Sequence, residues 1–464
     1  MAIKRLLKLC GVIGLLCIPF LGNIKDARSA EFVSGVVQAP SADSTVAAMN
    51  ENHNDWNAWT TVDGVSETAD HQIVLASNTS EHPKAGVESA QKSESHSQAV
   101  AAVEDFLELA KYGKAIHVMA MLMVGFGFLM VFVKRYGYGA VTATYLAVSF
   151  VIPYYMFMKK IGIFGEPAEL KMDRLILAEF CAASILIATG AFLGRLKMSQ
   201  YLIMALMFVP SYMLNEWIML DNGMGLIPKG LLIDTGGSIV IHQFGAYFGL
   251  GVIVRMTTGE DFKKWPIESD KQSNQFSMLG SMILWIFWPS FCAAPAPVSL
   301  MPTAAVNTIL SLCGATLATY VASIMIRKKI AIEDMANAAL AGGVAIGSSC
   351  AHTTPLCSLI LGVVAGIVSV IGFAVIQPRV QKALKGIDTC GVHNLHGMPG
   401  MLGGLAAIFI AKDVVPGLQI KGVFITFIIA WITGLAAGTV VSLFGYRKQA
   451  YEDSVEFIIE EEHH

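Results

Sequence analysis

The sequence is poor in charged residues and lacks several short site motifs. Only 14% of its 464 residues are Asp, Glu, Lys or Arg, whereas 54% are hydrophobic, and soluble domains carry about 25% charged residues. The 8 cysteines form no CxxC pair and no HExxH sequence occurs, so nothing in the spacing indicates a disulfide framework or a metal site. The net charge of −3 argues against nucleic-acid binding. The scarcity of charged residues disfavours a single soluble domain and leaves a membrane protein as the alternative.

The N-terminus predicts a secretory signal peptide over residues 1–30. Lys4 and Arg5 precede an apolar run from Leu9 to Leu21, and small residues follow up to Ala30. The apolar run fits the ~7–15 residues of a signal core and is shorter than the ~20 residues of a spanning helix. An uncleaved first membrane helix remains the competing interpretation.

Residues 31–115 are rich in Ser, Ala, Asp, Glu and Asn and have an excess of acidic side chains. Without a sustained hydrophobic period they predict a largely disordered, extracytoplasmic segment. Within it, residues 102–112 have an apolar face, which predicts a short amphipathic helix at the membrane surface.

Apolar segments then recur at regular intervals, and we expect an all-α, polytopic channel domain over 116–446 and a short cytoplasmic tail over 447–464. Lys and Arg concentrate in alternate loops, which places the acidic segment outside and the C-terminus inside the plasma (inner) membrane. The eleven candidate spans are 116–133, 138–158, 175–194, 200–220, 236–254, 276–297, 302–326, 335–351, 355–377, 394–411 and 422–446.

Two histidines lie in spans where a polar side chain is costly and therefore marks a functional candidate. His242 is in the fifth span, eight residues after Asp234, and His396 is in the tenth, beside a Pro/Gly break. Two facing neutral imidazoles can pass a proton because each has a donor and an acceptor nitrogen. Composition alone leaves open that both are buried helix contacts. His117, His352 and His393 are interpreted as structural.

Several stretches together resemble the Rhesus (Rh) branch of the ammonium transporter superfamily, and the resemblance runs from about residue 116 to residue 444. The longest, DTCGVHNLHGMPG, distinguishes this branch from the Amt branch. The stretches are IHVM (116–119), VGFGFLM (124–130), RYG (135–137), GGSIVIHQFGAYFGL (236–250), WPSF (288–291), NAALAGGVAIG (337–347) and DTCGVHNLHGMPG (388–400).

The resemblance implies a homotrimer of eleven-helix subunits, each with a narrow hydrophobic pore between two inverted halves. It makes His242 and His396 the paired pore histidines, and Phe180 and Phe291 the stacked aromatic gate at the outer mouth. Asp234 becomes a structural acid that caps backbone groups near the outer vestibule. No cofactor or metal is implied.

Two positions depart from the family pattern at the outer mouth. Glu179 stands before the first gate phenylalanine, where Asp is common, and Cys292 follows the second, where Asn is common. The first change keeps the acid of the vestibule. The second removes an amide from the mouth and so changes the polarity expected at the gate.

The predicted function is conduction of ammonia: ammonium loses its proton at the outer mouth and NH3 passes along the histidines. An isolated charge costs tens of kcal/mol to bury by an idealised Born calculation, so a buried ammonium should release its proton. A channel for CO2 or another small gas, and an ammonium sensor acting through a partner, remain alternatives. An enzyme is the weakest alternative because no nucleophile, base and orienting group come together in the sequence.

Overall fold

The computed structural model describes the backbone of residues 85–459 and the side chains from residue 101 onward. The predicted signal peptide (1–30) and residues 31–84 of the acidic segment lie outside the described residues. The chain divides into two units, Met1–Ala99 and Val100–His464. The described part of the first unit is the start of helix α2 (Ala85–Ala120).

Helix α2 differs from the arrangement expected for this part of the chain. It runs unbroken through the predicted surface helix (102–112) and across the boundary expected at residue 115. It continues as η2 (Met121–Phe126), α3 (Gly127–Leu129) and η3 (Met130–Phe132). The segment has no proline and is rich in Ala, Glu, Gln, Lys and Leu, which have high helix propensity. The residues from 85 to about 100, for which disorder was predicted, are therefore helical, because propensity supports a helix where hydrophobic periodicity is weak.

All regular structure in residues 85–459 is helical, and nine helical segments there are long and apolar enough to cross a membrane. Short α8 (Asp261–Lys264) and η10 (Asp453–Val455) lie outside them. The nine segments are Ala101–Phe132, α4 (Gly137–Lys160), α5 (Met172–Phe192), α6 (Met198–Leu220), η5 with α7 (Ser238–Met256), α9 (Lys271–Ala293), η6 with α10 (Val298–Arg327), α13 to α14 (Pro355–Leu384) and α16 (Pro416–Ser442).

The two remaining expected spans, 335–351 and 394–411, are helical but are not among those nine segments. The first consists of α11 (Ile332–Asn337), η7 (Ala338–Leu340) and α12 (Ala341–Ile346). The second consists of η9 (His393–Gly397) and α15 (Met398–Ile410). The first is divided into short pieces, and the second begins with polar His and Asn side chains, which lower its hydropathy.

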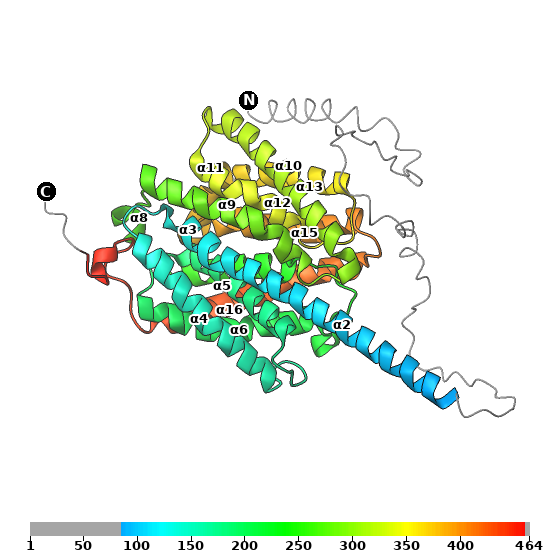
Figure 1. The fold of residues 1–464 in the computed structure, drawn as a ribbon. Coiled ribbons are helices and arrows are strands. Elements are labelled where there is room, and N and C mark those ends of the chain that lie inside the picture. The colour runs from blue at the N-terminus through cyan, green and yellow to red at the C-terminus, as the bar shows by residue number, and fades with distance from the viewer. Residues whose placement is uncertain (1–84, 460–464) are drawn as a thin grey trace, which may run out of the picture. The chain divides into compact units, whose positions relative to one another are not determined.

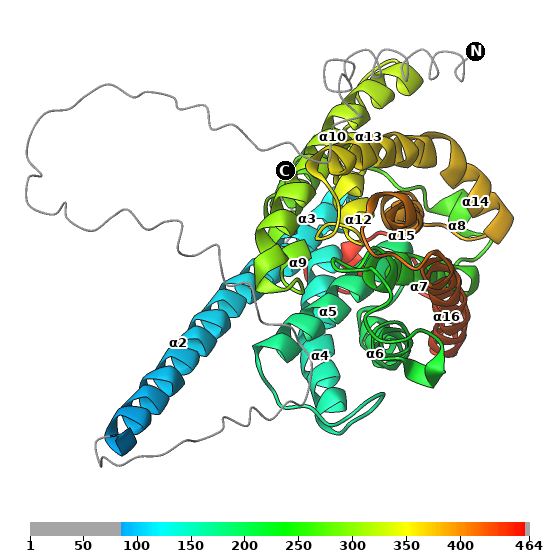
Figure 2. The same cartoon turned by 90° about the vertical axis from the view of Figure 1, so that its right-hand side faces the viewer.

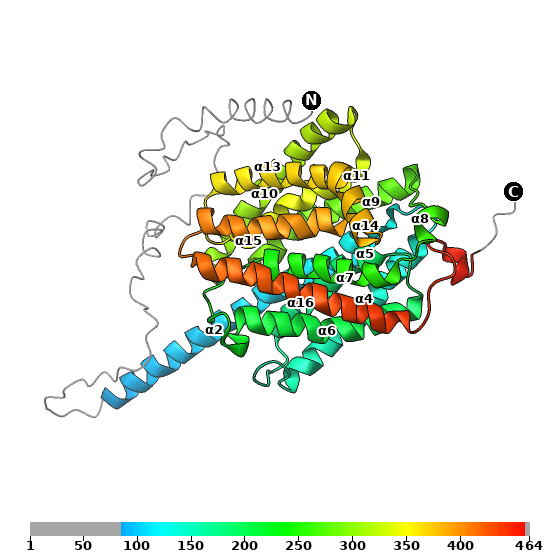
Figure 3. The ribbon, with the colours of Figure 1, turned by 180° about the vertical axis from the view of Figure 1, so that it is seen from behind.

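The helices of the second unit pack side by side around a buried centre. Figure 3 shows α13, α15, α7, α16 and α6 with roughly parallel axes, Figure 1 shows the bundle from the opposite side, and Figure 2 views several of these helices end-on. The most apolar windows of α5 and of η5–α7 are each 89% buried, against 33% for α4 and α16. The helix that carries His242 is therefore central, and α4 and α16 are peripheral.

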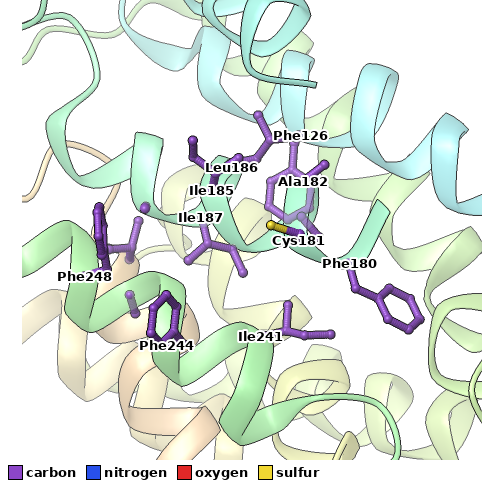
Figure 4. Packing of buried hydrophobic residues seen from close by; sticks show 14 of the residues in the cluster. Phe126, Phe180, Cys181, Ala182, Ile185, Leu186, Ile187, Ile241, Phe244 and Phe248 are labelled. Atoms are coloured by element: carbon purple, nitrogen blue, oxygen red, sulfur yellow. The ribbon is translucent and has the colours of Figure 1, made fainter. Parts of the chain in front are cut away.

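Small residues allow the central helices to approach closely, as is usual in membrane bundles. A methyl group added at Gly403 of α15 would overlap the carbonyl oxygen of Ala345 in α12. A methyl group added at Gly249 of α7 would lie 2.8 Å from the Ala191 side chain of α5. Larger side chains fill the space on both sides of α5, where Figure 4 shows its residues 185–187 between Phe126 and the Phe244 and Phe248 rings.

Candidate functional site

The two candidate histidines meet in the buried centre of the bundle. His242 lies in the last turn of η5 (Ser238–Gln243), and His396 lies in η9. Their Nδ1 atoms are 3.2 Å apart, and their rings are parallel within 6° with centroids 5.4 Å apart. Both are buried, and the Nε2 atom of His242 has no hydrogen-bond partner among the described residues. Both lie in π-helical turns, which are frequent at functional sites.

Aromatic rings enclose the histidine pair. Trp288 stacks on His242 with centroids 5.5 Å apart, and Phe291 lies 5.9 Å from the same imidazole. On the opposite side, Phe126 stacks on His396 at 6.2 Å. Trp288 and Phe126 were not singled out from the sequence, although each lies in one of the stretches that carry the family resemblance. The imidazoles are thus surrounded by apolar surface rather than by compensating charge.

The predicted gate residues are in contact. Phe180 of α5 and Phe291 of α9 have ring centroids 4.7 Å apart and an interplanar angle of 55°, and both rings are buried. Because Phe291 also contacts His242, the aromatic pair and the imidazole pair form one continuous stack. Glu179 is fully buried beside Phe180, and neither of its carboxylate oxygens has a hydrogen-bond partner in the described part of the chain.

Asp234 caps the helix that carries His242. Its carboxylate accepts hydrogen bonds from the backbone N–H groups of Ile239 (3.1 Å) and Val240 (2.8 Å). The Ser348 hydroxyl donates a third bond at 2.6 Å. The first N–H groups of a helix have no partner within the helix, so a carboxylate there both satisfies them and complements the helix dipole.

Asp388 occupies the equivalent position before the second histidine, and the sequence reasoning missed it. Its carboxylate accepts from the N–H groups of Val392 and His393, each at 3.0 Å. Burial raises the pKa of Asp388 to about 6, although the two backbone bonds favour the charged form. The available signal was a repeat: DTGG and DTCG each begin eight residues before a pore histidine candidate.

The loops that contain these two acids are attached to the bundle in the same way. The N–H groups of Thr235 and Gly236 donate to the carbonyls of Ser348 (3.3 Å) and Gly347 (2.6 Å), just beyond α12. Residues 389 and 390 donate in the same order to Ala191 and Gly190 at the end of α5, both at 3.0 Å. Each acid loop therefore hydrogen-bonds to the end of one helix, while its Asp caps the start of the helix that carries a histidine. The same arrangement is found at Asp234 and at Asp388.

One cavity borders His396, and a second cavity lies next to the first. The first has a volume of about 20 Å³ and is lined by His396 and by mostly apolar side chains, including Phe126 and Leu395. The second has a volume of about 390 Å³ and is lined by polar residues such as Arg327 and Gln377. Phe132, Asn337 and Cys390 line both cavities. The larger cavity therefore lies next to the small one, and these three side chains stand between them.

The other three histidines of the apolar body do not join the pair. His117 Nδ1 is 2.9 Å from the Ser290 hydroxyl. The His393 ring contacts Tyr247 edge-on at 5.7 Å. The backbone carbonyl of His352 accepts from Lys412. Among the described residues, no three His, Cys, Asp or Glu side chains are grouped as metal ligands.

Comparisons with known proteins place this geometry among transporters and channels. The sequence profile of the Ammonium Transporter Family matches residues 95–456. Ammonium transporter Rh type B from Sus scrofa is 35% identical over 76% of this chain and 83% of its own length. The same type from Takifugu rubripes is 38% identical over 74% and 82%. The solved structure of Nitrosomonas europaea Rh50, described as a Rhesus family channel, is 53% identical, covers 75% of this chain and 92% of its own, and superposes with a TM-score of 0.73.

Proposed function

This chain belongs to the ammonium transporter family, in its Rhesus branch, and is a multi-pass membrane channel for ammonia or ammonium; we propose that its substrate crosses the centre as uncharged NH3. The observation that carries this proposal is the buried, hydrogen-bonded pair of His242 and His396. The pair offers nitrogen donors and acceptors inside an aromatic enclosure and offers no carboxylate that could hold a cation.

The outer half of the mechanism separates the proton from ammonium. An isolated cation in a medium of low dielectric constant costs tens of kcal/mol by an idealised Born calculation, so release of the proton is the favoured route. We place this step at the contact between Phe180 and Phe291, where one N–H bond of ammonium breaks and water in the outer mouth takes the proton. The buried acid Glu179 lies beside Phe180 at this mouth. Asp234 supports the mouth by capping the helix of His242. Potassium has no proton to release and is excluded.

The inner half of the mechanism carries ammonia to the cytoplasmic side. A site of at least about 10–15 Å³ is needed to hold one water molecule, and ammonia is similar in size. The cavity of about 20 Å³ below His396 therefore has room for one ammonia molecule and not for a hydrated cation. From there the molecule would pass the side chains shared with the larger, polar cavity and reach water.

The finer architecture follows from the duplicated contacts. We propose eleven spanning helices, counting the short segments that contain α12 and α15, arranged as two inverted halves. The support is the pairing of each acid loop with a helix of the other half, Thr235 and Gly236 beyond α12 and residues 389 and 390 at the end of α5. We further propose that the protein is a homotrimer, as the resemblance to the Rhesus branch implies. We place the N-terminal segment outside the plasma (inner) membrane, because alternate loops are rich in Lys and Arg.

The decisive experiment measures ammonia-driven alkalinisation of proteoliposomes by stopped flow. We expect wild type to exceed empty vesicles and His242→Ala and His396→Ala to lose the excess, because each removes half of the central pair. His352→Ala is the matched histidine control and should retain it. Equal rates in empty and loaded vesicles would refute the channel, and normal rates in both pore variants would refute the role of the pair. Parallel uptake of CO2 tests the small-gas alternative.

A further inference from the structure

Two free thiols lie side by side next to the proposed gate. Cys292 directly follows Phe291 on α9, and Cys350 lies just beyond α12. Both are fully buried and unoxidised. The Cys350 thiol is 3.5 Å from the carbonyl oxygen of Gly347 and 3.8 Å from the backbone carbonyl oxygen of Cys292 itself, so the two cysteine residues are direct neighbours.

The thiols also contact the loop of the outer structural acid. A methyl group added at Gly236 would lie 2.8 Å from the Cys292 sulfur atom. The same glycine donates its N–H to Gly347, three residues before Cys350. Cys292 is therefore confined between the Asp234 loop and the end of α12. Ordinary packing requires only a small side chain here, whereas two neighbouring cysteines can also be joined by a disulfide, which Ala or Ser cannot form.

We propose that Cys292 and Cys350 are a redox-sensitive modification site at the outer mouth. Hydrogen peroxide converts the two thiols to one disulfide: the O–O bond and two S–H bonds break, the S–S bond forms, and two water molecules leave. The sulfur atoms are oxidised and the peroxide oxygens are reduced. Peroxide is small and uncharged, as ammonia is, so it suits an entrance that excludes ions. In the proposed orientation this mouth faces the oxidising side of the membrane, where disulfides persist.

The cross-link would change conduction through Phe291. A disulfide fixes the two Cβ atoms about 3.5–4.5 Å apart, which ties the C-terminal end of α9 to the chain beyond α12. Phe291 is the immediate neighbour of Cys292 and packs on both Phe180 and His242. Restraining this position opposes the movement of the ring that substrate passage requires. The oxidised channel should therefore conduct less ammonia, a consequence that rests on the proposed function.

The test treats purified protein and proteoliposomes with hydrogen peroxide. Mass spectrometry without reductant should detect a 292–350 cross-linked peptide, lighter than its two parent peptides by two hydrogen atoms. Ammonia flux should fall toward that of empty vesicles and recover with a phosphine reductant. Cys292→Ser and Cys350→Ser should abolish both the cross-link and the peroxide sensitivity. Cys313→Ser and Cys357→Ser, which remove partly buried thiols elsewhere, are the matched controls and should leave both intact.

Several results would overturn the inference. Recovery of both thiols in the reduced form, under conditions that oxidise Cys313 and Cys357, would overturn it. Inhibition of Cys292→Ser by peroxide as strong as that of wild type would also overturn it. A cross-link without a change in flux would retain the modification site and refute its control of the gate. The cross-linked peptide is measured independently of transport, so failure of wild-type flux would refute the proposed function without removing the disulfide result.

Discussion

Replacement of Asp234 distinguishes a capping acid from a substrate-binding acid. In Asp234→Asn, the oxygen at the Oδ1 position can still accept from Ser348 and Ile239, whereas the bond from Val240 to Oδ2 (2.8 Å) is lost. In Asp234→Ala all three donors lose their acceptor. If the acid acts by capping, the alanine variant should be severely impaired and the asparagine variant only mildly so.

The expected magnitudes follow from the three bonds. Hydrogen bonds to a charged acceptor contribute about 1.5–3 kcal/mol each, so Asp234→Ala should lose about 4–5 kcal/mol at the low end of that range. Removing a buried charge offsets part of this loss, which leaves about 3 kcal/mol. Asp234→Asn loses one bond and should cost about 1–2 kcal/mol.

The assay combines thermal unfolding in detergent with ammonia flux in proteoliposomes. We expect the melting temperature to fall in the order wild type, Asp234→Asn, Asp234→Ala, with flux of the asparagine variant close to wild type. Asp221→Asn is the matched control because that carboxylate is partly exposed and pairs only with Lys229 at 3.2 Å. Loss of flux in Asp234→Asn at an unchanged melting temperature would show that the charge acts on substrate and would refute the capping argument.

Three further predictions test other parts of the fold. Burial raises the pKa of Asp388 from 3.8 to about 6, so the folded protein binds the carboxyl proton of Asp388 more tightly than the unfolded chain does. The stability of wild type relative to Asp388→Asn should therefore decrease as the pH rises from about 4 to about 6. An increase in relative stability over this pH range would contradict the raised pKa. Gly403→Ala should destabilise by about 1–3 kcal/mol by overlap with Ala345, whereas Gly113→Ala, with open space around it, should be neutral or stabilising. Arg447→Ala removes donors to Glu456, Glu452 and Leu196 and should make the C-terminal tail more sensitive to limited proteolysis, while an unchanged cleavage rate would refute its anchoring role.

Polar residues stand out in apolar spans, which made His242 and His396 candidates, and the resemblance to the Rhesus branch implied that they are the pore pair. The structure brings their rings together, and their role in conduction stays a prediction. The aromatic residues around them were not, since Trp288 and Phe126 resemble any buried apolar side chain until the fold shows which ring they face. Their role depends on tertiary contacts that no spacing encodes.

The weaker predictions failed for identifiable physical reasons. Helix α2 was expected to begin near residue 102, but intrinsic propensity extends it to Ala85 without an apolar face. Asp388 was overlooked because it lies in a loop, although its relation to His396 repeats that of Asp234 to His242. Comparing the two loops with each other, rather than each with a motif, would have revealed it.

The Nδ1–Nδ1 contact between the two imidazoles makes a nearly symmetric pair electronically unequal. Only one hydrogen can lie between the two nitrogens at 3.2 Å, so when both rings are neutral one carries its proton on Nδ1 and the other carries it on Nε2. One outward-facing Nε2 is then an acceptor and the other a donor. If a proton were passed along the pair, it would exchange these two assignments and leave the pair polarised in the opposite sense. A second proton could then follow in the same direction only after the rings had turned or their protons had moved back. The pair therefore suits the passage of a neutral molecule, which needs no such reset.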